Sequence, residues 1–286
     1  MPPKFELPQK AGQIMVFAAR AMWLWAVLQF VCSFDLGLAA GVLYGLFGAN
    51  LFGFVTGLAA IIPALMAVLF AVSKYGKPEF TKPEKFGRTL GIGLCIGLFL
   101  SVVISLFTAF FEIGGNLELP TANFSANWFL YLTAAVIGPV LEELFFRGLL
   151  YKRLAGFNWI FAAVVSSVAF GLLHLNIPQF LSATAIGMVL AWSMRETGSV
   201  ITPIIIHVIV NTLSLLIIYF PGILLVEIIA AVVGFILLIV ALPRVSNELR
   251  STEGSSVFYE QIFDSPWCWS YIVFMAIGCF AMSVIG

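Results

Sequence analysis

The sequence predicts an all-α, polytopic integral membrane protein: a helical bundle of about eight to nine transmembrane helices. Three observations lead to this prediction. Of the 286 residues, 62% are hydrophobic and only 10% are charged, whereas a soluble domain carries about 25% charged residues. The mean hydropathy is +1.08. Roughly nine stretches are apolar over the length of about 20 residues that a helix needs to cross a bilayer.

Short polar breaks or breaks with Gly and Pro separate these stretches and set the expected helix boundaries. The first three spans form an N-terminal part, residues 1–126, and the next four form a central core, residues 127–216. The last two lie in residues 217–286, with a charged linker at 243–266. The Gly/Ala-rich segment 36–49 is a candidate re-entrant or interfacial piece of the second span. The expected spans are 14–34, 50–73, 89–111, 127–150, 158–175, 179–194, 199–219, 222–242 and 267–285.

Basic residues gather in alternate connections, as the positive-inside rule requires. With a cytoplasmic N-terminus, the outside connections carry only Asp35, Glu112 and Glu118. Arg20 and Arg147 are the basic residues inside predicted spans. The inside segments carry Lys4 and Lys10, then Lys74, Lys77, Lys82, Lys85 and Arg88, then Lys152 and Arg153, then Arg195, and finally Arg244 and Arg250. We therefore expect a multi-pass protein with its N-terminus in the cytoplasm.

Charge and cysteine usage exclude two classes of function. Fourteen Lys and Arg balance fourteen Asp and Glu, so there is no basic excess to hold a nucleic-acid backbone. No nucleic-acid partner is expected. The cysteines are isolated in or beside apolar stretches, without the spacing of a disulfide framework or a zinc cage, and are read as buried small hydrophobes: Cys32, Cys95, Cys268 and Cys279.

Ionisable residues inside spans call for an explanation, because each costs about 2.5–3.5 kcal/mol at the bilayer centre. In the fourth span, Glu143 and Arg147 are four residues apart, the spacing at which a carboxylate and a guanidinium meet on one helix face. Glu142 is turned about 100° away and has no charge partner in its own helix. It is therefore a candidate general base. The alternative is that all three residues form ionic contacts between helices that only orient the bundle.

Both histidines of the chain also fall inside apolar spans. His174 follows Phe170 in the fifth span, and His207 precedes Asn211 by four residues in the seventh. Measured from the nearest turn, Glu142 lies about 20 Å deep, His174 about 26 Å, His207 about 14 Å and Asn211 about 20 Å. The four polar groups thus share one layer of the membrane, as expected for a site. The alternative is that each histidine only forms a hydrogen bond between helices and has a structural role.

This set of side chains favours chemistry with activated water. The sequence has no G-x-S-x-G motif and no cysteine beside either histidine, so a serine or cysteine nucleophile is not indicated. A carboxylate beside a histidine can deprotonate water, and a second histidine with an asparagine amide can stabilise an oxyanion. The alternative is a divalent metal such as zinc, held by Glu142, His174 and His207. No H-E-x-x-H motif is present to decide between them.

Three motifs in this region resemble those of the CPBP family, the CAAX proteases and bacteriocin-processing enzymes. This family, also called Abi, includes the type II CAAX prenyl endopeptidase. The motif EExxxR corresponds to Glu142 to Arg147, FxxxH to Phe170 to His174, and HxxxN to His207 to Asn211. They occur in the family's order within residues 127–216, and Thr197-Gly198-Ser199 before the last motif is also similar to the family.

The resemblance implies an endopeptidase with its site inside the membrane. Glu142 would then activate water with help from His174, while His207 and Asn211 would stabilise the oxyanion. Glu143, Arg147 and Phe170 would support these residues. No cofactor is expected, and the substrate would be a peptide or protein, with a lipidated one as a candidate. CAAX-type C-terminal processing and the maturation of peptides or bacteriocins both remain open.

Two other functions remain as alternatives. A catalytically idle immunity or scaffold protein would keep the geometry of the motifs, and a proton-coupled transporter would also place Glu, His and Arg inside the membrane. Arg20 and Glu227 are left without a role, and either pair with each other or extend toward the interface. Gly91, Gly93 and Gly97 predict a close helix contact, within one chain or between two copies.

Overall fold

The computed structural model describes residues 6–111, 113, 128–217, 219–220, 222–251, 260, 262 and 264–285. These residues form helices and turns and contain no strand, which confirms the predicted all-α class. Lys4, Glu112, Glu118 and the middle of the charged linker, 252–259, lie outside the described residues.

Each predicted span corresponds to an apolar helix, which confirms a multi-pass membrane protein. Six helices in the described part of the chain are long and apolar enough to cross a membrane: Lys10–Cys32, Leu51–Tyr75, Phe86–Phe110, Trp128–Ala155, Ile177–Thr197 and Ile223–Glu248. Three apolar helices are shorter: Trp159–Leu172, Ile201–Leu216 and Pro266–Ala281.

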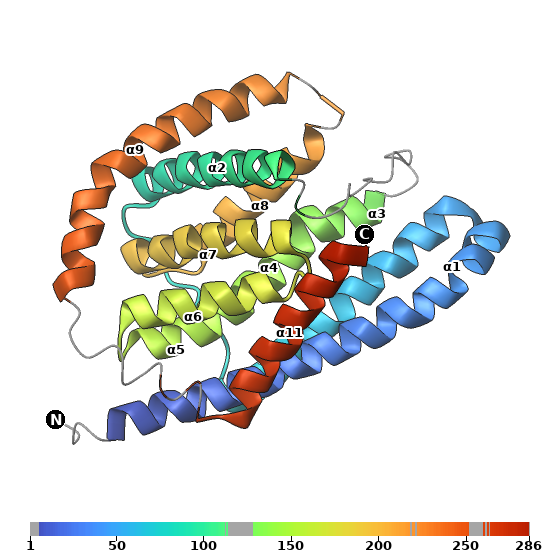
Figure 1. Ribbon diagram of the computed structural model, residues 1–286, viewed down its shortest axis with the longest axis horizontal. Helices are drawn as coiled ribbons and strands as arrows, with labels where there is room; N and C mark the ends of the chain where they lie inside the picture. The colour runs from blue at the N-terminus through green and yellow to red at the C-terminus, as the bar shows by residue number, and fades with distance from the viewer. Residues whose placement is uncertain are drawn as a thin grey trace.

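The first two spans form one long helical hairpin, α1 (Glu6–Tyr75) (Figure 1). Its two arms meet at Gly48, whose φ of 75° and ψ of 178° interrupt the helix. Only glycine adopts this conformation without strain, because it has no Cβ. The segment 36–49 was expected to belong to the second span, and this is wrong. It continues the helix of the first span, and the chain reverses at Gly48.

The remaining helices are stacked in layers between α1 and α9 (Ile223–Ser251) (Figure 1). From α9 inward, the order is α2 (Phe86–Phe110), then α7 (Ile177–Thr197) with α8 (Ile201–Leu216) beside it, then α6 (Trp159–Leu172). The C-terminal helix α11 (Pro266–Ile285) packs on α1, α6 and α7. Of the glycines noted in α2, Gly93 and Gly97 face Ile206 and Val210 of α8, so they make a contact within one chain.

The fourth span changes its helical type along its length. It consists of α3 (Trp128–Leu132), the π-helix η1 (Thr133–Ile137), α4 (Gly138–Glu143), the π-helix η2 (Leu144–Tyr151) and α5 (Lys152–Ala155). A π-helix bonds each N–H to the carbonyl five residues back and occurs frequently at functional sites. The two glutamates at the end of α4 therefore lie between two such irregular segments.

Caps fix the ends of the helices that follow. Asn158 accepts a 2.9 Å hydrogen bond from the N–H of Phe161 at the start of α6, and Asn176 accepts one of 2.8 Å from Gln179 at the start of α7. Such caps satisfy N–H groups that a helix start leaves free. At the other end of α7, Gly198 has a φ of 63° and donates its N–H to Met194. This left-handed glycine reverses the chain into α8.

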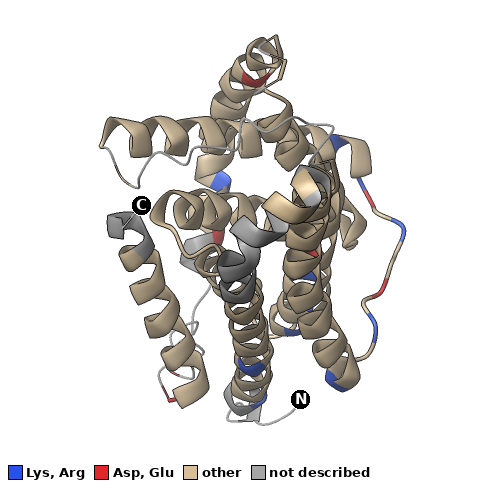
Figure 2. Ribbon diagram, turned by 90° about the vertical axis from the view of Figure 1, so that its right-hand side faces the viewer, with Lys and Arg blue, Asp and Glu red and all other residues tan. Residues whose placement is uncertain are grey.

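The connection between α1 and α2 is attached to the turn between α7 and α8. Thr81 donates a 2.7 Å hydrogen bond to the carbonyl of Gly198, and Ser199 returns one of 2.6 Å to the carbonyl of Thr81. In Figure 2 this connection runs along one side of the bundle, with basic and acidic residues alternating. The Thr197-Gly198-Ser199 stretch thus holds a connection in place.

Several segments that were predicted to lie on the inside meet at one end of the bundle. Lys152 donates a 2.8 Å hydrogen bond to Glu79, and Arg195 donates one of 2.6 Å to Glu248. The hydrogen bond and charge of Lys152 hold the pKa of Glu79 below its ordinary value. These contacts agree with the predicted alternation of crossings. Which compartment this end faces stays a prediction.

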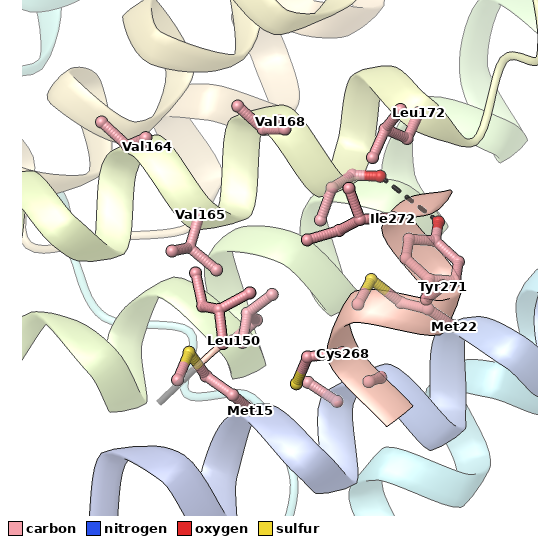
Figure 3. A pocket seen from close by; sticks show the side chains of 14 residues that line it. Met15, Met22, Leu150, Val164, Val165, Val168, Leu172, Cys268, Tyr271 and Ile272 are labelled. Carbon is pink, nitrogen blue, oxygen red and sulfur yellow. Dashed lines mark hydrogen bonds between the residues drawn. The ribbon is translucent and has the colours of Figure 1, made fainter. Parts of the chain in front are cut away.

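An apolar cavity of about 180 Å³ lies between α1, α6, α11 and η2 (Figure 3). Met15, Val168 and Cys268 line it, and the hydroxyl of Tyr271 at its edge donates to the carbonyl of Ala169 at 3.5 Å. Cys268 and Cys279 are buried, as expected, whereas Cys32 and Cys95 are half-buried. Val168 lies about 200° around α6 from Phe170, so the cavity is separate from the motif residues.

Candidate active site

A fully buried ion pair forms the centre of the motif region. Nη1 of Arg147 donates a 2.8 Å hydrogen bond to Oε1 of Glu143, and both side chains are 0% exposed. The pair predicted from the i, i+4 spacing is therefore confirmed. Nη2 of Arg147 donates to the carbonyl of Gly187 at 3.0 Å, and the guanidinium lies 4.9 Å from the ring centroid of Phe170. These contacts hold the guanidinium from three helices.

His207 lies between the two glutamates of the first motif. Its Nδ1 is 3.0 Å from Oε1 of Glu143, and its Nε2 is 3.7 Å from Oε2 of Glu142. Glu143 pairs with Arg147 as a carboxylate, which can only accept hydrogen bonds. Nδ1 of His207 therefore carries a proton and donates it, which leaves Nε2 facing Glu142. This arrangement fixes the orientation of the imidazole ring.

The two glutamates differ in exposure. The side chain of Glu143 is completely buried and its Oε1 holds both Arg147 and His207, whereas the side chain of Glu142 is 21% exposed. Glu142 is thus the accessible acid of the pair. It has no cation of its own within α4, as the sequence predicted.

Asn211 is held by a backbone carbonyl of the fourth span, a contact that the sequence analysis missed. Its Nδ2 donates a 3.2 Å hydrogen bond to the carbonyl of Ala134 in η1. In the π-helical pattern each N–H bonds to the carbonyl five residues back, and the N–H of Gly138 bonds to the carbonyl of Thr133. The carbonyl of Ala134 would then accept from the N–H of residue 139. This residue is Pro139, which has no N–H. The carbonyl of Ala134 is therefore available to position Asn211.

His174 joins the cluster through Phe170. Its Nδ1 lies 3.2 Å from the carbonyl of Phe170, which can only accept, so Nδ1 carries a proton and donates it. The Phe170 ring packs edge to face on His174 and on His207, with centroid distances of 5.1 and 5.5 Å. Among the described residues, His174 and Glu142 make no direct hydrogen bond, so the expected assistance of His174 stays a prediction.

Two glycines that sequence reasoning did not single out let α7 approach the site. A Cβ on Gly187 would lie 2.9 Å from Nη2 of Arg147 and 3.0 Å from Cβ of Ser167. A Cβ on Gly171, within the FxxxH motif, would lie 2.7 Å from the carbonyl of Phe180. The signal in the sequence was a glycine inside an apolar helix, where it costs about 1 kcal/mol relative to alanine and so indicates close packing.

The alternative metal site requires Glu142, His174 and His207 to converge on one point. In the part of the chain that the structure describes, no group of three or more His, Cys, Asp or Glu side chains is placed to hold a metal ion. Glu142 and His207 approach one another, but His174 is linked to them through an aromatic ring. The residues Glu142, His174 and His207 therefore do not form a ligand set in this structure.

The suggested pairing of Arg20 with Glu227 is wrong. The guanidinium of Arg20 lies 5.0 Å from the ring centroid of Trp267 in α11, whereas Glu227 is on α9 at the opposite edge of the bundle (Figure 1). Glu227 is 8% exposed and its Oε1 makes no hydrogen bond to the described residues.

Comparison with known proteins supports the resemblance seen in the three motifs. Residues 123–213 match the family described as "Type II CAAX prenyl endopeptidase Rce1-like". A protein of Bacillus subtilis (strain 168), described as "Putative membrane peptidase YdiL", is 34% identical over 87 residues, which make up 29% of this chain and 34% of the relative. The chain thus spans about a third of the length of this curated relative. No solved structure matches.

The matched segment contains all the motif residues, from Glu142 to Asn211. The likeness to the CPBP family of membrane proteases is therefore confirmed for this third of the chain.

Proposed function

We propose, on the premise of this family match, that the protein is an intramembrane endopeptidase that hydrolyses peptide bonds with a water molecule activated by Glu142. The family match supports a membrane peptidase in general. The apolar helices support a site enclosed within a membrane. The finer proposal concerns which side chains perform the reaction.

The observation that carries the proposal is that Glu142 and Glu143 differ in exposure and in hydrogen-bond partners. Glu143 is fully buried, and its Oε1 holds Arg147 and His207, so a substrate water has no access to this carboxylate. Glu142 is partly exposed and its Oε2 is 3.7 Å from His207. This separation is too long for a direct hydrogen bond, so Oε2 of Glu142 is not committed to His207. Glu142 is thus the accessible acid beside a second polar group.

In the proposed reaction, Glu142 takes a proton from water, and the resulting hydroxide forms a bond to the carbonyl carbon of the scissile peptide. The tetrahedral oxyanion accepts hydrogen bonds from Nε2 of His207 and from the second N–H of the Asn211 amide, whose first N–H is held by Ala134. When the C–N bond breaks, Glu142 returns its proton to the leaving amine. His174 assists Glu142 in orienting the water.

The charges of the cluster support this division of roles. For Nε2 of His207 to donate, the ring must be protonated on both nitrogens. The carboxylate of Glu143, 3.0 Å from Nδ1, compensates the charge of this imidazolium. Two carboxylates, Glu142 and Glu143, are then balanced by Arg147 and the protonated His207. A neutral total suits a cluster removed from water, where isolated charges are costly.

The proposed substrate is a peptide or a flexible protein terminus at the membrane. CAAX-type C-terminal processing is one candidate, because the matched family is described as a CAAX prenyl endopeptidase. Maturation of peptides or bacteriocins is the other. No step of the proposed mechanism passes through a metal.

A comparison of new protein termini tests the proposal. Membranes from cells with the wild-type chain are compared with membranes from cells with Glu142→Gln at matched expression, and a metal chelator is added in a second series. We expect termini that occur only with wild type and that persist with chelator. Identical profiles, with both proteins folded and abundant, would refute the peptidase. They would instead support a catalytically idle immunity or scaffold protein.

A further inference from the structure

A second cavity, lined by polar residues, lies away from the motif residues, between the arms of α1 and the start of α11. Its volume is about 630 Å³. Gln13 and Arg20 line it from the first arm of α1, and Lys74 lines it from the end of the second arm. Asp264, Ser265 and Trp267 line it from α11 and the residues just before it. Polar side chains from three segments thus face one space.

The cavity is level with helix ends. The hydroxyl of Tyr75, the last residue of α1, donates a 3.1 Å hydrogen bond to the carbonyl of Ile14, so residues near 14 lie beside the end of the hairpin. Arg20 is six residues further along the helix, or about 9 Å. Arg153, which follows the fourth span's apolar residues, also donates to the carbonyl of Tyr75. Arg20 shares the cavity with Lys74, next to the last residue of α1, and with Asp264, just before α11, so its guanidinium reaches the level of the helix ends.

Trp267 holds the guanidinium of Arg20 in place. The Cζ atom of Arg20 is 5.0 Å from the centroid of the Trp267 ring, a cation–π contact. A cation–π contact is not a hydrogen bond, so it leaves the N–H groups of the guanidinium available to an acceptor. Tryptophan is typical of the interface level of membrane proteins. The contact therefore presents the donors of Arg20 at the depth of lipid headgroups.

The charges of the cavity favour an anion. Two cations, Arg20 and Lys74, face one carboxylate, Asp264. Among the described residues, neither Arg20 nor Lys74 has a carboxylate within 4.0 Å. The side chains of Arg20 and Lys74 are exposed, so an anionic ligand can reach both and compensate their charges. Arginine matches phosphate with two parallel N–H groups, whereas lysine binds it as a point charge.

We propose that this cavity binds the phosphate of a membrane phospholipid headgroup, with Arg20 and Lys74 as its cationic ligands. Gln13 and Ser265, which also line the cavity, supply neutral donors. The position of the cavity at the helix ends and the tryptophan beside Arg20 favour a lipid as the source of the phosphate. This inference is independent of the proposed peptidase activity, because the cavity shares no residue with the motifs.

Native mass spectrometry of the full chain in detergent tests the proposal. The probes are phosphatidylglycerol, phosphatidylcholine and inorganic phosphate. We expect phosphatidylglycerol to bind at least fivefold more tightly to wild type than to Arg20→Gln, with an intermediate affinity for Arg20→Lys because the charge remains without the planar fork. Lys74→Gln is expected to weaken binding at least twofold. Lys82→Gln, in the connection between α1 and α2 and outside the cavity, is the matched control and is expected to bind as wild type.

Equal affinity of wild type, Arg20→Gln and Lys74→Gln for phosphatidylglycerol would overturn the proposal. Displacement of the lipid by millimolar inorganic phosphate would also overturn it, since the site would then prefer free phosphate. If Arg20→Gln fails to fold, Arg20→Lys and Lys74→Gln still decide the outcome. Circular dichroism of each variant provides the check on folding.

Discussion

Replacement of Gly187 by alanine tests whether α7 positions the buried ion pair. The new Cβ would lie 2.9 Å from Nη2 of Arg147, 3.0 Å from Cβ of Ser167 and 3.1 Å from its Oγ. Arg147 cannot withdraw easily, because it is fully buried and bonded to Glu143 at 2.8 Å. The methyl group must therefore displace a guanidinium that also donates to the carbonyl of residue 187.

The expected magnitude follows from two opposing effects. Overpacking of a filled core costs about 1–3 kcal/mol. Replacing a glycine in a helix interior by alanine raises the free energy of unfolding by roughly 0.5–1 kcal/mol. We therefore expect Gly187→Ala to lower the free energy of unfolding by about 1–2 kcal/mol. At Gly91, where a Cβ would meet nothing within 4 Å, the same change is expected to raise it by roughly 0.5–1 kcal/mol.

Reversible unfolding in mixed detergent micelles measures both variants against wild type. The reasoning also predicts a loss of activity in Gly187→Ala alone, because Arg147 holds Glu143, and Glu143 orients His207. A Gly187→Ala protein as stable as Gly91→Ala would refute the packing argument. A destabilised but fully active Gly187→Ala would refute the link from α7 to the site.

Three further predictions concern the site. Arg147→Met is expected to lower the free energy of unfolding by about 3–5 kcal/mol, because Glu143 would remain as a buried unpaired charge; a double change with Glu143→Gln should recover part of this loss in the same unfolding assay. Glu142→Gln is expected to alter the free energy of unfolding by less than about 0.5 kcal/mol while it reduces peptide cleavage at least about 100-fold, and comparable loss in both measurements would contradict its role as a base. Pro139→Ala is expected to make the helix more stable but to reduce cleavage by about tenfold to 100-fold, since the restored N–H competes with Asn211 for its carbonyl acceptor; unchanged cleavage would show that this contact is dispensable.

Local spacing explains why part of the site was predictable. Glu143 and Arg147 meet because residues four apart share one helix face, whatever surrounds the helix. The same rule left Glu142 without a partner in its helix. Counting residues from the nearest turns predicted that both histidines lie in one layer of the membrane. In the structure His207 lies beside both glutamates.

Other contacts of the site depend on features that no spacing rule contains. The irregular helix before Gly138, with Pro139 after it, frees the carbonyl of Ala134 for Asn211. The carbonyl of Gly187, on another helix, accepts a hydrogen bond from the guanidinium of Arg147. In both cases the partner comes from a distant segment, so the contact follows from packing and not from local sequence.

The sequence by itself determined the membrane class, the approximate positions of the apolar helices, and the ion pair within one helix. These properties depend on apolar length and on helical periodicity, which act within a single segment. The tertiary structure decided that His207 shares Glu143 with Arg147, that the chain reverses at Gly48, and that Arg20 lines a cavity with Lys74 from the end of α1. The physical reason is that apolar helices resemble one another on every face, so hydropathy fixes where a helix crosses but not which neighbour it meets.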